Sequence, residues 1–295
     1  MLTEESRHHD FPALTDMAYL NTAAESIPPV SVHEALAQYA RDKGLGMRGR
    51  VPHNETMEAC REVAARMVGL QTEEVSFCSC SSEAYNLLAN ALHLGTDDEV
   101  VITDLDFPAG ATPWLNAAEP PQTRLWQARG GALNANDLPA LLNEHTRLVQ
   151  VSLVSFYNGH RLDWSPFIET VRTHAPQVIV AVDVTQALGR VELDCTDFDI
   201  LISSTHKWTL GVHGGCVVGI PENRENGRDL TTHAGGWYHL QNAFEADRFE
   251  RTVRKPGAAS FSVGMPNYAA IYALNAALRY LEQIGVANIT THADP

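Results

Sequence analysis

The chain has 295 residues, of which 44% are hydrophobic and 19% charged, a composition typical of a globular protein with one large or two ordinary domains. Its formal net charge of −15 argues against nucleic acids and anionic membranes as partners, because both require clustered Lys and Arg. There is no signal-peptide pattern, no apolar run approaching ~18 residues, and no zinc-ligand spacing among the five cysteines. We therefore expect a reduced, cytoplasmic protein with no membrane segment and no metal site.

Helical and strand patterns alternate along the chain, which indicates a mostly parallel sheet covered on both faces. The first half predicts helices over 32–41, 55–68, 82–92 and 109–117, and strands over 74–78, 100–103, 123–127 and 148–153. The second half predicts a helix over 166–174 with Ser165 as N-cap, strands over 178–182, 199–202 and 216–220, an irregular polar stretch over 221–260, and a long helix over 267–283 that ends at Gly285.

A carboxylate, Asp183, follows the continuous apolar run 178–182, and Gln186 lies three residues further on. Such a run is expected of a strand buried on both faces. Ligands of open α/β sheets bind outside the carboxyl ends of the strands, so a charge at this point is well placed for binding. Taken alone, an Asp here is more often a helix cap or a turn residue.

A lysine, Lys207, follows the strand predicted over 199–202 and stands between His206 and Trp208. Partial burial lowers the pKa of a lysine and makes its neutral amine available for imine formation. The alternative is a surface lysine in a loop. Glycines at 211, 214 and 215 indicate close approach of the backbone and favour a site.

Two serines, Ser81 and Ser82, stand where the strand over 74–78 runs into a helix. Their hydroxyls and the free N–H groups of the helix N-terminus would form a cradle for an anion, although an ordinary serine cap is the better explanation of this piece alone. An anion cradle, a strand-end Asp and a strand-end Lys, in that order on one α/β sheet, match the requirements of pyridoxal 5'-phosphate (PLP).

From the segment 19–24 to about residue 289, the sequence resembles the class V aminotransferase family of fold-type I PLP enzymes, which includes cysteine desulfurases, selenocysteine lyases and isopenicillin N epimerases. The strongest stretches are Ala181-Val-Asp-Val-Thr-Gln-Ala-Leu-Gly189 and Ser204-Thr-His-Lys-Trp208, and the 24-residue separation of Asp183 and Lys207 is close to the family's. The resemblance implies an N-terminal segment over 1–22 and a PLP-binding large α/β domain over 23–264, with a mostly parallel seven-stranded sheet between helices. Residues 265–295 would be a long connecting helix and the start of a small C-terminal domain that is largely missing.

The resemblance assigns the chemistry to three residues at matching positions. Lys207 would form the Schiff base with PLP and later move protons at the substrate Cα. Asp183 would pair with the protonated pyridine nitrogen and keep the ring an electron sink. Gln186 would hydrogen-bond the 3'-oxygen of the ring.

The resemblance also assigns residues to the phosphate and to the face of the ring. Ser81 and Ser82 match the small hydroxyl pair that holds the phosphate, and Ser204 and His206 would complete that end. Phe107 falls where the family stacks an aromatic residue or a His on the ring. A phenylalanine stacks but shares no proton, and a plain core position is its alternative.

Two departures from the family pattern bear on function. Where the family commonly has Arg-Phe-Glu-x-Gly-Thr-Pro, this chain reads Ser260-Phe-Ser-Val-Gly-Met-Pro266, so we expect Met265 to lack the bond that the family's Thr makes to the partner subunit's phosphate. Relatives continue for on the order of 100 residues, which carry the Arg for the substrate carboxylate and a desulfurase's catalytic Cys. The chain would be either a fragment or a shortened enzyme with another carboxylate anchor.

The leading hypothesis is a PLP enzyme that acts on the amino group or Cα of a small amino acid, with transamination as the default of the class. Elimination at a C–S bond and epimerisation are alternatives, whereas persulfide-forming desulfuration is disfavoured because none of the five cysteines lies in the matching loop. A truncated, non-catalytic dimerisation or partner-binding protein is the alternative from another class, and a nucleotide-binding Rossmann protein lacks its Gly-x-Gly-x-x-Gly. By resemblance we expect a homodimer.

Overall fold

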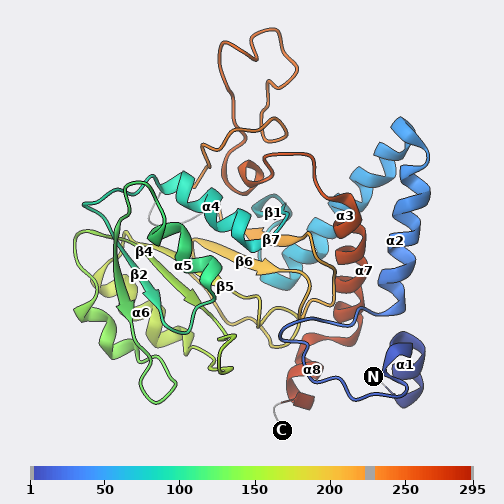
Figure 1. Cartoon of the computed structure of the whole chain (residues 1–295), viewed down its shortest axis with the longest axis horizontal. Helices are drawn as coiled ribbons and strands as arrows, with labels where there is room; N and C mark the ends of the chain where they lie inside the picture. The colour runs from blue at the N-terminus through green and yellow to red at the C-terminus, as the bar shows by residue number, and fades with distance from the viewer. Residues whose placement is uncertain (1–2, 223–229, 294–295) are drawn as a thin grey trace.

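A seven-stranded sheet runs through the centre of the molecule in the computed structural model, which describes residues 3–222 and 230–293 (Figure 1). The strand order is β1-β7-β6-β5-β4-β2-β3, in which β7 is antiparallel to both neighbours and the other pairs are parallel. The strands are β1 (Val75–Cys78), β2 (Glu99–Thr103), β3 (Gln122–Trp126), β4 (Thr146–Ser152), β5 (Ile179–Asp183), β6 (Ile200–Ser204) and β7 (Cys216–Gly219). The predicted mostly parallel, seven-stranded sheet is confirmed.

Eight α-helices are described around this sheet, joined by short 3-10 turns. The α-helices are α1 (Glu4–Asp10), α2 (Val30–Lys43), α3 (Arg50–Val68), α4 (Ser81–Leu92), α5 (Pro108–Leu115), α6 (Trp164–His174), α7 (Tyr268–Ile284) and α8 (Val286–Ala293). The 3-10 turns are η1 (Pro12–Leu14), η2 (Gly46–Gly49), η3 (Thr72–Glu74), η4 (Ala135–Ala140) and η5 (Gly257–Phe261). No helix in the described part of the chain is both long and apolar enough to cross a bilayer.

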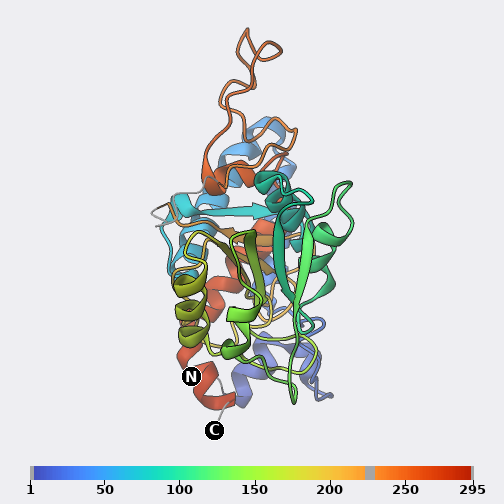
Figure 2. The same cartoon turned by 90° about the vertical axis from the view of Figure 1, so that its left-hand side faces the viewer.

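Alternate residues of each buried strand serve two hydrophobic cores, one on each face of the sheet. In β5, Val180 and Val182 join the core under α3, α6 and α7, whereas Ile179 and Ala181 join the core under α4 and α5. Figure 2 shows α6 and α5 on opposite sides of the sheet. Each fully buried Val or Ile contributes about 1.5–3 kcal/mol, so the continuous apolar run in the sequence needs a cover on both faces.

The long helix α7 packs against α2 and α3 rather than standing apart from the sheet. Its N-cap is Asn267, whose side chain accepts a hydrogen bond from the N–H of Ala270, and Gly285 ends it with φ +83°. A second helix, α8, follows directly and was not predicted as a separate element. The division of the chain at residues 22 and 264 into segment, large domain and incomplete small domain stays a prediction.

The start of α6 differs from the prediction, because Asp163 and not Ser165 is the N-cap residue. The indole of Trp164 is buried and donates to the carbonyl oxygen of Thr196 at 2.8 Å. A serine cap stabilises a helix by about 1 kcal/mol, whereas burial of a large side chain contributes about 1.5–3 kcal/mol. Burial of the tryptophan therefore draws the helix start to Trp164. In the stretch predicted to be irregular, residues 223–229 lie outside the described residues.

Candidate functional site

The carboxyl ends of β4, β5 and β6 open into a cavity of about 390 Å³. It brings together seven of the eight predicted site residues: Ser81, Phe107, Asp183, Gln186, Ser204, His206 and Lys207. The other lining residues are Asn21, Ala23, Ala24, Ser152, Val154, Phe156 and Thr185. A strand-end carboxylate and a strand-end amine therefore face one space, as the sequence-based hypothesis requires.

Ser82 is the predicted site residue that does not line this cavity, and its side chain is exposed. Ser81 and Ser82 are the first two residues of α4, and successive side chains on a helix point about 100° apart. One of two adjacent serines can therefore face the cavity while the other faces solvent. The cavity therefore contains only the first hydroxyl of the expected pair, and the phosphate-binding role of Ser82 stays a prediction.

A larger cavity of about 860 Å³ lies between the end of α3 and the segment 188–198. It contains none of the predicted site residues. We place the candidate site in the smaller cavity, because a lysine and a carboxylate that could take part in a reaction line it together. The volume of a cavity does not by itself indicate a reactive site.

Lys207 projects from the loop that follows β6, with its Nζ atom 5.3 Å from the centre of the Phe107 ring. Burial lowers the pKa of Lys207, while the carboxylates of Asp183 and Glu25 act in the opposite direction. A lowered pKa increases the neutral fraction of the amine, which is the form that attacks an aldehyde.

The glycines after Lys207 allow the loop to fold tightly against Thr205, as the sequence indicated. A Cβ atom at Gly211 would lie 2.6 Å from the carbonyl oxygen of Thr205, and one at Gly215 would lie 2.5 Å from its Oγ1. The hydroxyl of Thr205 in turn donates toward the carbonyl oxygens of Val212 and Gly215. These contacts fix the backbone two residues before the amine.

Asp183 is the last residue of β5, and both of its carboxylate oxygens accept a hydrogen bond. Oδ1 accepts from the backbone N–H of Thr185 at 2.8 Å, and Oδ2 accepts from the hydroxyl of Tyr85 at 2.8 Å. Tyr85 lies on α4, and its hydroxyl accepts from Nε2 of Gln150 at 3.1 Å. Burial and the charge of Asp183 raise the pKa of Tyr85 well above its ordinary value, so the phenol keeps its proton and donates it.

Gln186 connects three parts of the chain at the edge of the cavity. Its Nε2 atom donates to the carbonyl oxygen of Ala23 at 2.9 Å, and its Oε1 atom accepts from Nε1 of Trp208 at 2.7 Å. An amide nitrogen has two N–H groups, so one donor remains for a ligand oxygen. This arrangement is compatible with the role expected for Gln186.

The N-terminus of α4 supplies backbone donors beside Ser81. The first intrahelical bond runs from the N–H of Ala84 to the carbonyl oxygen of Cys80, so the N–H groups of Ser81 and Ser82 precede the hydrogen-bonded ladder. The carboxylate of Glu83 does not occupy these donors. It accepts from the N–H and the hydroxyl of Ser79, two residues before the helix, at 2.6 Å each. Free donors at a helix N-terminus are suited to bind an anion.

His206 also lines the cavity, and its ring stacks on that of His213 with ring centres 4.5 Å apart. Burial, His213 and Lys207 all lower the pKa of His206, so its ring is neutral near neutral pH. A neutral imidazole donates one hydrogen bond but adds no charge. His213 also lies 3.1 Å from the carboxylate of Glu25.

Phe107 is the N-cap residue of α5, and its ring is 45% exposed. The ring of Phe156 meets it edge to face at 5.0 Å, and both line the cavity. The alternative of a plain core phenylalanine is therefore wrong. An aromatic face is available to a ring bound beside Lys207.

The family model described as aminotransferase class V matches residues 18–294. The chain belongs to this family. A cysteine desulfurase of Cronobacter sakazakii is 31% identical over 305 residues, which cover 95% of this chain and 72% of that protein. An uncharacterized aminotransferase of Bacillus subtilis, YcbU, is 25% identical and matches 96% of this chain and 74% of its own length.

Among solved structures, a mutant of C-DES with glycine covalently linked to its PLP cofactor superimposes with a TM-score of 0.85. Its sequence identity is 23%, and the match covers 95% of this chain and 75% of that one. At this identity the likeness shows the fold, which confirms the fold-type I expectation. Class V aminotransferases are PLP-dependent enzymes, so family membership confirms the expected class of protein and cofactor.

The donor set of the cavity fits this cofactor. Lys207 offers a primary amine to an aldehyde, and Asp183 offers a carboxylate to a protonated ring nitrogen. Phe107 offers an aromatic face, and Ser81 with the start of α4 offers donors to a phosphate. The volume of about 390 Å³ lies within the range of small-molecule sites. The individual role of each residue stays a prediction.

Sequence reasoning missed Tyr85, Gln150 and the buried carboxyl of Asp106. Oδ1 of Asp106 accepts from the hydroxyl of Ser152, which lines the cavity, at 2.9 Å. Tyr85 was open to prediction, because it lies four residues after Ser81 and therefore on the same face of α4. Asp106 gave no such signal, because Ser152, through which it meets the cavity, lies 46 positions away in sequence.

Proposed function

We propose that this protein is a PLP-dependent lyase that cleaves the carbon–sulfur bond of a cysteine-type amino acid. The observation that carries the proposal is the presence of Lys207 and Asp183 in one cavity at the carboxyl ends of β5 and β6. The Cronobacter relative, named a cysteine desulfurase, supports the lyase alternative over the transamination that the class suggests by default.

When bound, PLP supplies an electron sink for bonds at the substrate Cα. Lys207 would hold the aldehyde end of the cofactor, and as a free amine it would take the proton from the substrate Cα. Burial lowers the pKa of Lys207 and so increases the fraction of that free amine. Asp183 would keep a proton on the ring nitrogen.

The remaining residues bind and orient. Ser81, Ser204 and the start of α4 bind the phosphate, and His206 adds one neutral donor at that end. Phe107 would offer its aromatic face to the ring. Gln186 donates its second N–H to the 3'-oxygen.

Sulfur is released without transfer to a cysteine of this cavity. None of the described lining residues is a cysteine, and of the five free cysteines Cys60, Cys78, Cys195 and Cys216 are buried while Cys80 is exposed at the N-cap of α4. The described lining of the cavity thus offers no thiol to accept the sulfur.

The cofactor site is tested by reducing the purified protein with borohydride in the presence of PLP and mapping the labelled peptide. We expect a pyridoxyl group on Lys207 and loss of the visible cofactor band in Lys207→Ala. Lys255→Ala is the matched control, because burial also lowers the pKa of Lys255, whose Nζ donates to the carbonyl oxygen of Tyr238 outside the cavity. A label on another lysine, or a wild-type protein that binds no PLP, would refute the site.

The products formed from cysteine identify the reaction. Pyruvate, ammonia and sulfide together indicate β-elimination, and alanine with released sulfur indicates desulfuration. Transamination is the second candidate, because one relative is named an aminotransferase. It would yield 3-mercaptopyruvate from cysteine and aminate an added keto acid. Absence of turnover with a wide panel of amino acids would favour a non-catalytic, partner-binding protein.

A further inference from the structure

The hydroxyl of Tyr85 contacts the carboxylate of Asp183 from within the buried core. Tyr85 is 0% exposed and Gln150 is 1% exposed, and neither lines the cavity. Their side chains form a chain of hydrogen bonds that runs from Nε2 of Gln150 to the Tyr85 oxygen at 3.1 Å and from the Tyr85 hydroxyl to Oδ2 of Asp183 at 2.8 Å. Three different elements, β4, α4 and β5, are joined at this point.

The direction of these hydrogen bonds is fixed by charge. An ionised carboxylate can only accept, so the single proton of the Tyr85 hydroxyl points at Asp183. Nε2 of Gln150 can only donate, so the tyrosine oxygen accepts a hydrogen bond from Gln150 while its own proton is donated to Asp183. Gln150 thereby orients Tyr85, and Tyr85 orients Asp183.

The hydroxyl is not needed for packing. The ring of Tyr85 lies in the core under α4 with Leu88, Trp114 and Ile179, where a phenylalanine would fill the same space. Burial of a hydroxyl costs free energy unless it is hydrogen-bonded. Its position on the Asp183 carboxylate indicates a polar role at this site.

We propose that Tyr85, oriented by Gln150, is a positioning residue that holds the Asp183 carboxylate in place for the ring nitrogen of the cofactor. The inference rests on the proposed cofactor site. The N–H of Thr185 holds Oδ1 and the Tyr85 hydroxyl holds Oδ2, so the carboxylate cannot rotate without breaking one of these bonds. Hydrogen bonds donated to a charged group are about twice as strong as neutral ones, which makes the orientation rigid.

The test compares binding of PLP with binding of its deaza analogue, in which a carbon replaces the ring nitrogen. In the wild-type protein we expect PLP to bind more tightly, because only PLP offers a proton to Asp183. In Tyr85→Phe the PLP dissociation constant should rise about 10- to 100-fold, the range that one hydrogen bond to a charged group represents, while the analogue's changes little. The ratio of the analogue's dissociation constant to that of PLP therefore falls. A general loss of structure would weaken the binding of both compounds and would not produce this change.

Tyr272→Phe is the matched control. The hydroxyl of Tyr272 also donates at 2.8 Å to a buried carboxylate, that of Asp42, but this pair lies between α2 and α7. We expect a comparable loss of thermal stability and an unchanged binding ratio. Gln150→Leu keeps the tyrosine but removes its donor, and should lower the ratio less than Tyr85→Phe does; it also serves if Tyr85→Phe does not fold.

Each outcome separates this inference from the cofactor site itself. A wild-type protein that binds neither compound overturns both. Discrimination by the wild type that persists unchanged in Tyr85→Phe and Gln150→Leu overturns only the positioning role and leaves the cofactor site standing. A smaller ratio in both variants, with Tyr272→Phe unaffected, supports it.

Discussion

Asp106 is a buried carboxyl directly before Phe107, and its Oδ2 accepts from the N–H of Thr103 at 3.0 Å. Burial is the main cause that raises its pKa from 3.8 to about 7, and the charge of Asp183 acts in the same direction. Its proton is therefore retained in the folded protein at pH values where the unfolded chain has already lost it. Stability from this group is fully present below about pH 4 and is lost as the pH rises toward 7.

We predict that Asp106→Asn removes this dependence. Between about pH 4 and pH 7 the wild-type protein should lose on the order of 4 kcal/mol of its free energy of unfolding, since one pKa unit corresponds to about 1.4 kcal/mol. Asparagine can still accept from Thr103 and donate to Ser152. Free energies of unfolding, measured at several pH values across that interval, should fall for the wild type and stay flatter for the variant. Parallel curves would contradict the assignment.

At the scale of single residues, the sequence predicted what depends on position along a strand. Asp183 and Lys207 could be placed because both stand at strand ends, where a parallel sheet collects its functional groups. The side chain of Ser82 could not be oriented, because the rotation of α4 relative to the cavity is set by tertiary packing. The Tyr85–Asp183 bond joins residues 98 positions apart, a pairing that no local pattern encodes.

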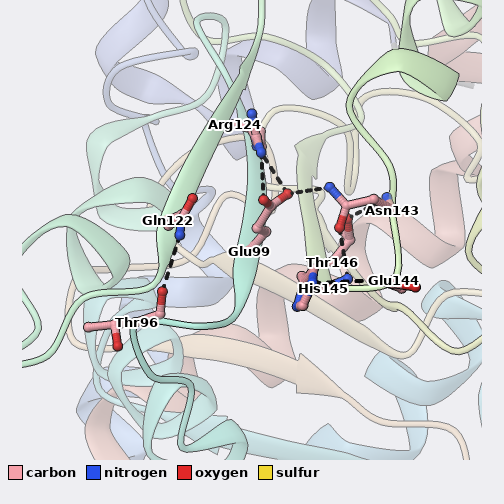
Figure 3. Close-up of polar contacts among 8 residues, drawn as sticks. All are labelled: Thr96, Glu99, Gln122, Arg124, Asn143, Glu144, His145 and Thr146. Carbon is pink, nitrogen blue, oxygen red and sulfur yellow. Dashed lines mark hydrogen bonds and ion pairs between the residues drawn. The ribbon is translucent and has the colours of Figure 1, made fainter.

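At the scale of elements, a buried carboxylate joins β2 to the outer strand β3. Figure 3 shows Glu99 between Arg124 and Asn143. Arg124 donates to both oxygens of Glu99, at 2.6 and 3.0 Å, and Nδ2 of Asn143 donates at 2.7 Å. The hydrogen bond from Arg124 is the main cause that lowers the pKa of Glu99, so its contribution to stability is lost as the pH falls through that lowered value.

We predict that Glu99→Gln destabilises the fold by about 1–3 kcal/mol, because a side chain only 7% exposed loses charged hydrogen bonds. Glu282→Gln is the matched control. Glu282 accepts the same two-pronged contact from Arg66, at 2.7 and 3.0 Å, but it is 38% exposed, and such pairs contribute at most about 1 kcal/mol. Urea unfolding of both variants gives the comparison, and equal costs would show that burial of Glu99 does not matter.

Existence and type of elements followed from periodicity, whereas their ends did not. The run over 178–182 predicted β5 to within one residue, because burial on both faces leaves a continuous apolar signature. The helix predicted from residue 55 begins at Arg50, after the 3-10 turn η2, where the sequence has no strong cap. Local signals weaken at the ends of elements, and tertiary contacts decide there.

At the scale of the whole molecule, the alternation of elements predicted the layers but not the direction of every strand. The reversal of β7 depends on the short loop between Lys207 and Cys216, which turns the chain back beside β6. The glycines of that loop were recognised as marks of a site. These glycines also allow the chain to turn back so that β7 lies antiparallel to β6, and this direction was not predicted from the sequence.

An arm formed by residues 240–254 projects beyond the helices in both views (Figures 1 and 2). Leu240 pairs with Arg254 at its base. Within the arm, Phe244 is 83% exposed, with its ring 5.7 Å from that of Trp237, and Phe249 is 90% exposed. Large exposed apolar side chains on one projecting segment indicate an interface. We propose that a second copy of this chain covers them, in line with the homodimer that the family resemblance implies.

The prediction is that the PLP-loaded protein sediments as a dimer and that Phe244→Ser with Phe249→Ser shifts it toward the monomer. Two serines remove the apolar surface of the arm and touch no residue that lines the cavity, so the variant should still fold. Leu20→Ser is the control, because Leu20 is 95% exposed but lies in the N-terminal segment. A wild type that sediments as a monomer, or equal dissociation in the control, would remove the arm as the contact. Retained dimerisation in the double variant would direct the search to another face of the molecule, because the exposed phenylalanines would then contribute nothing to association.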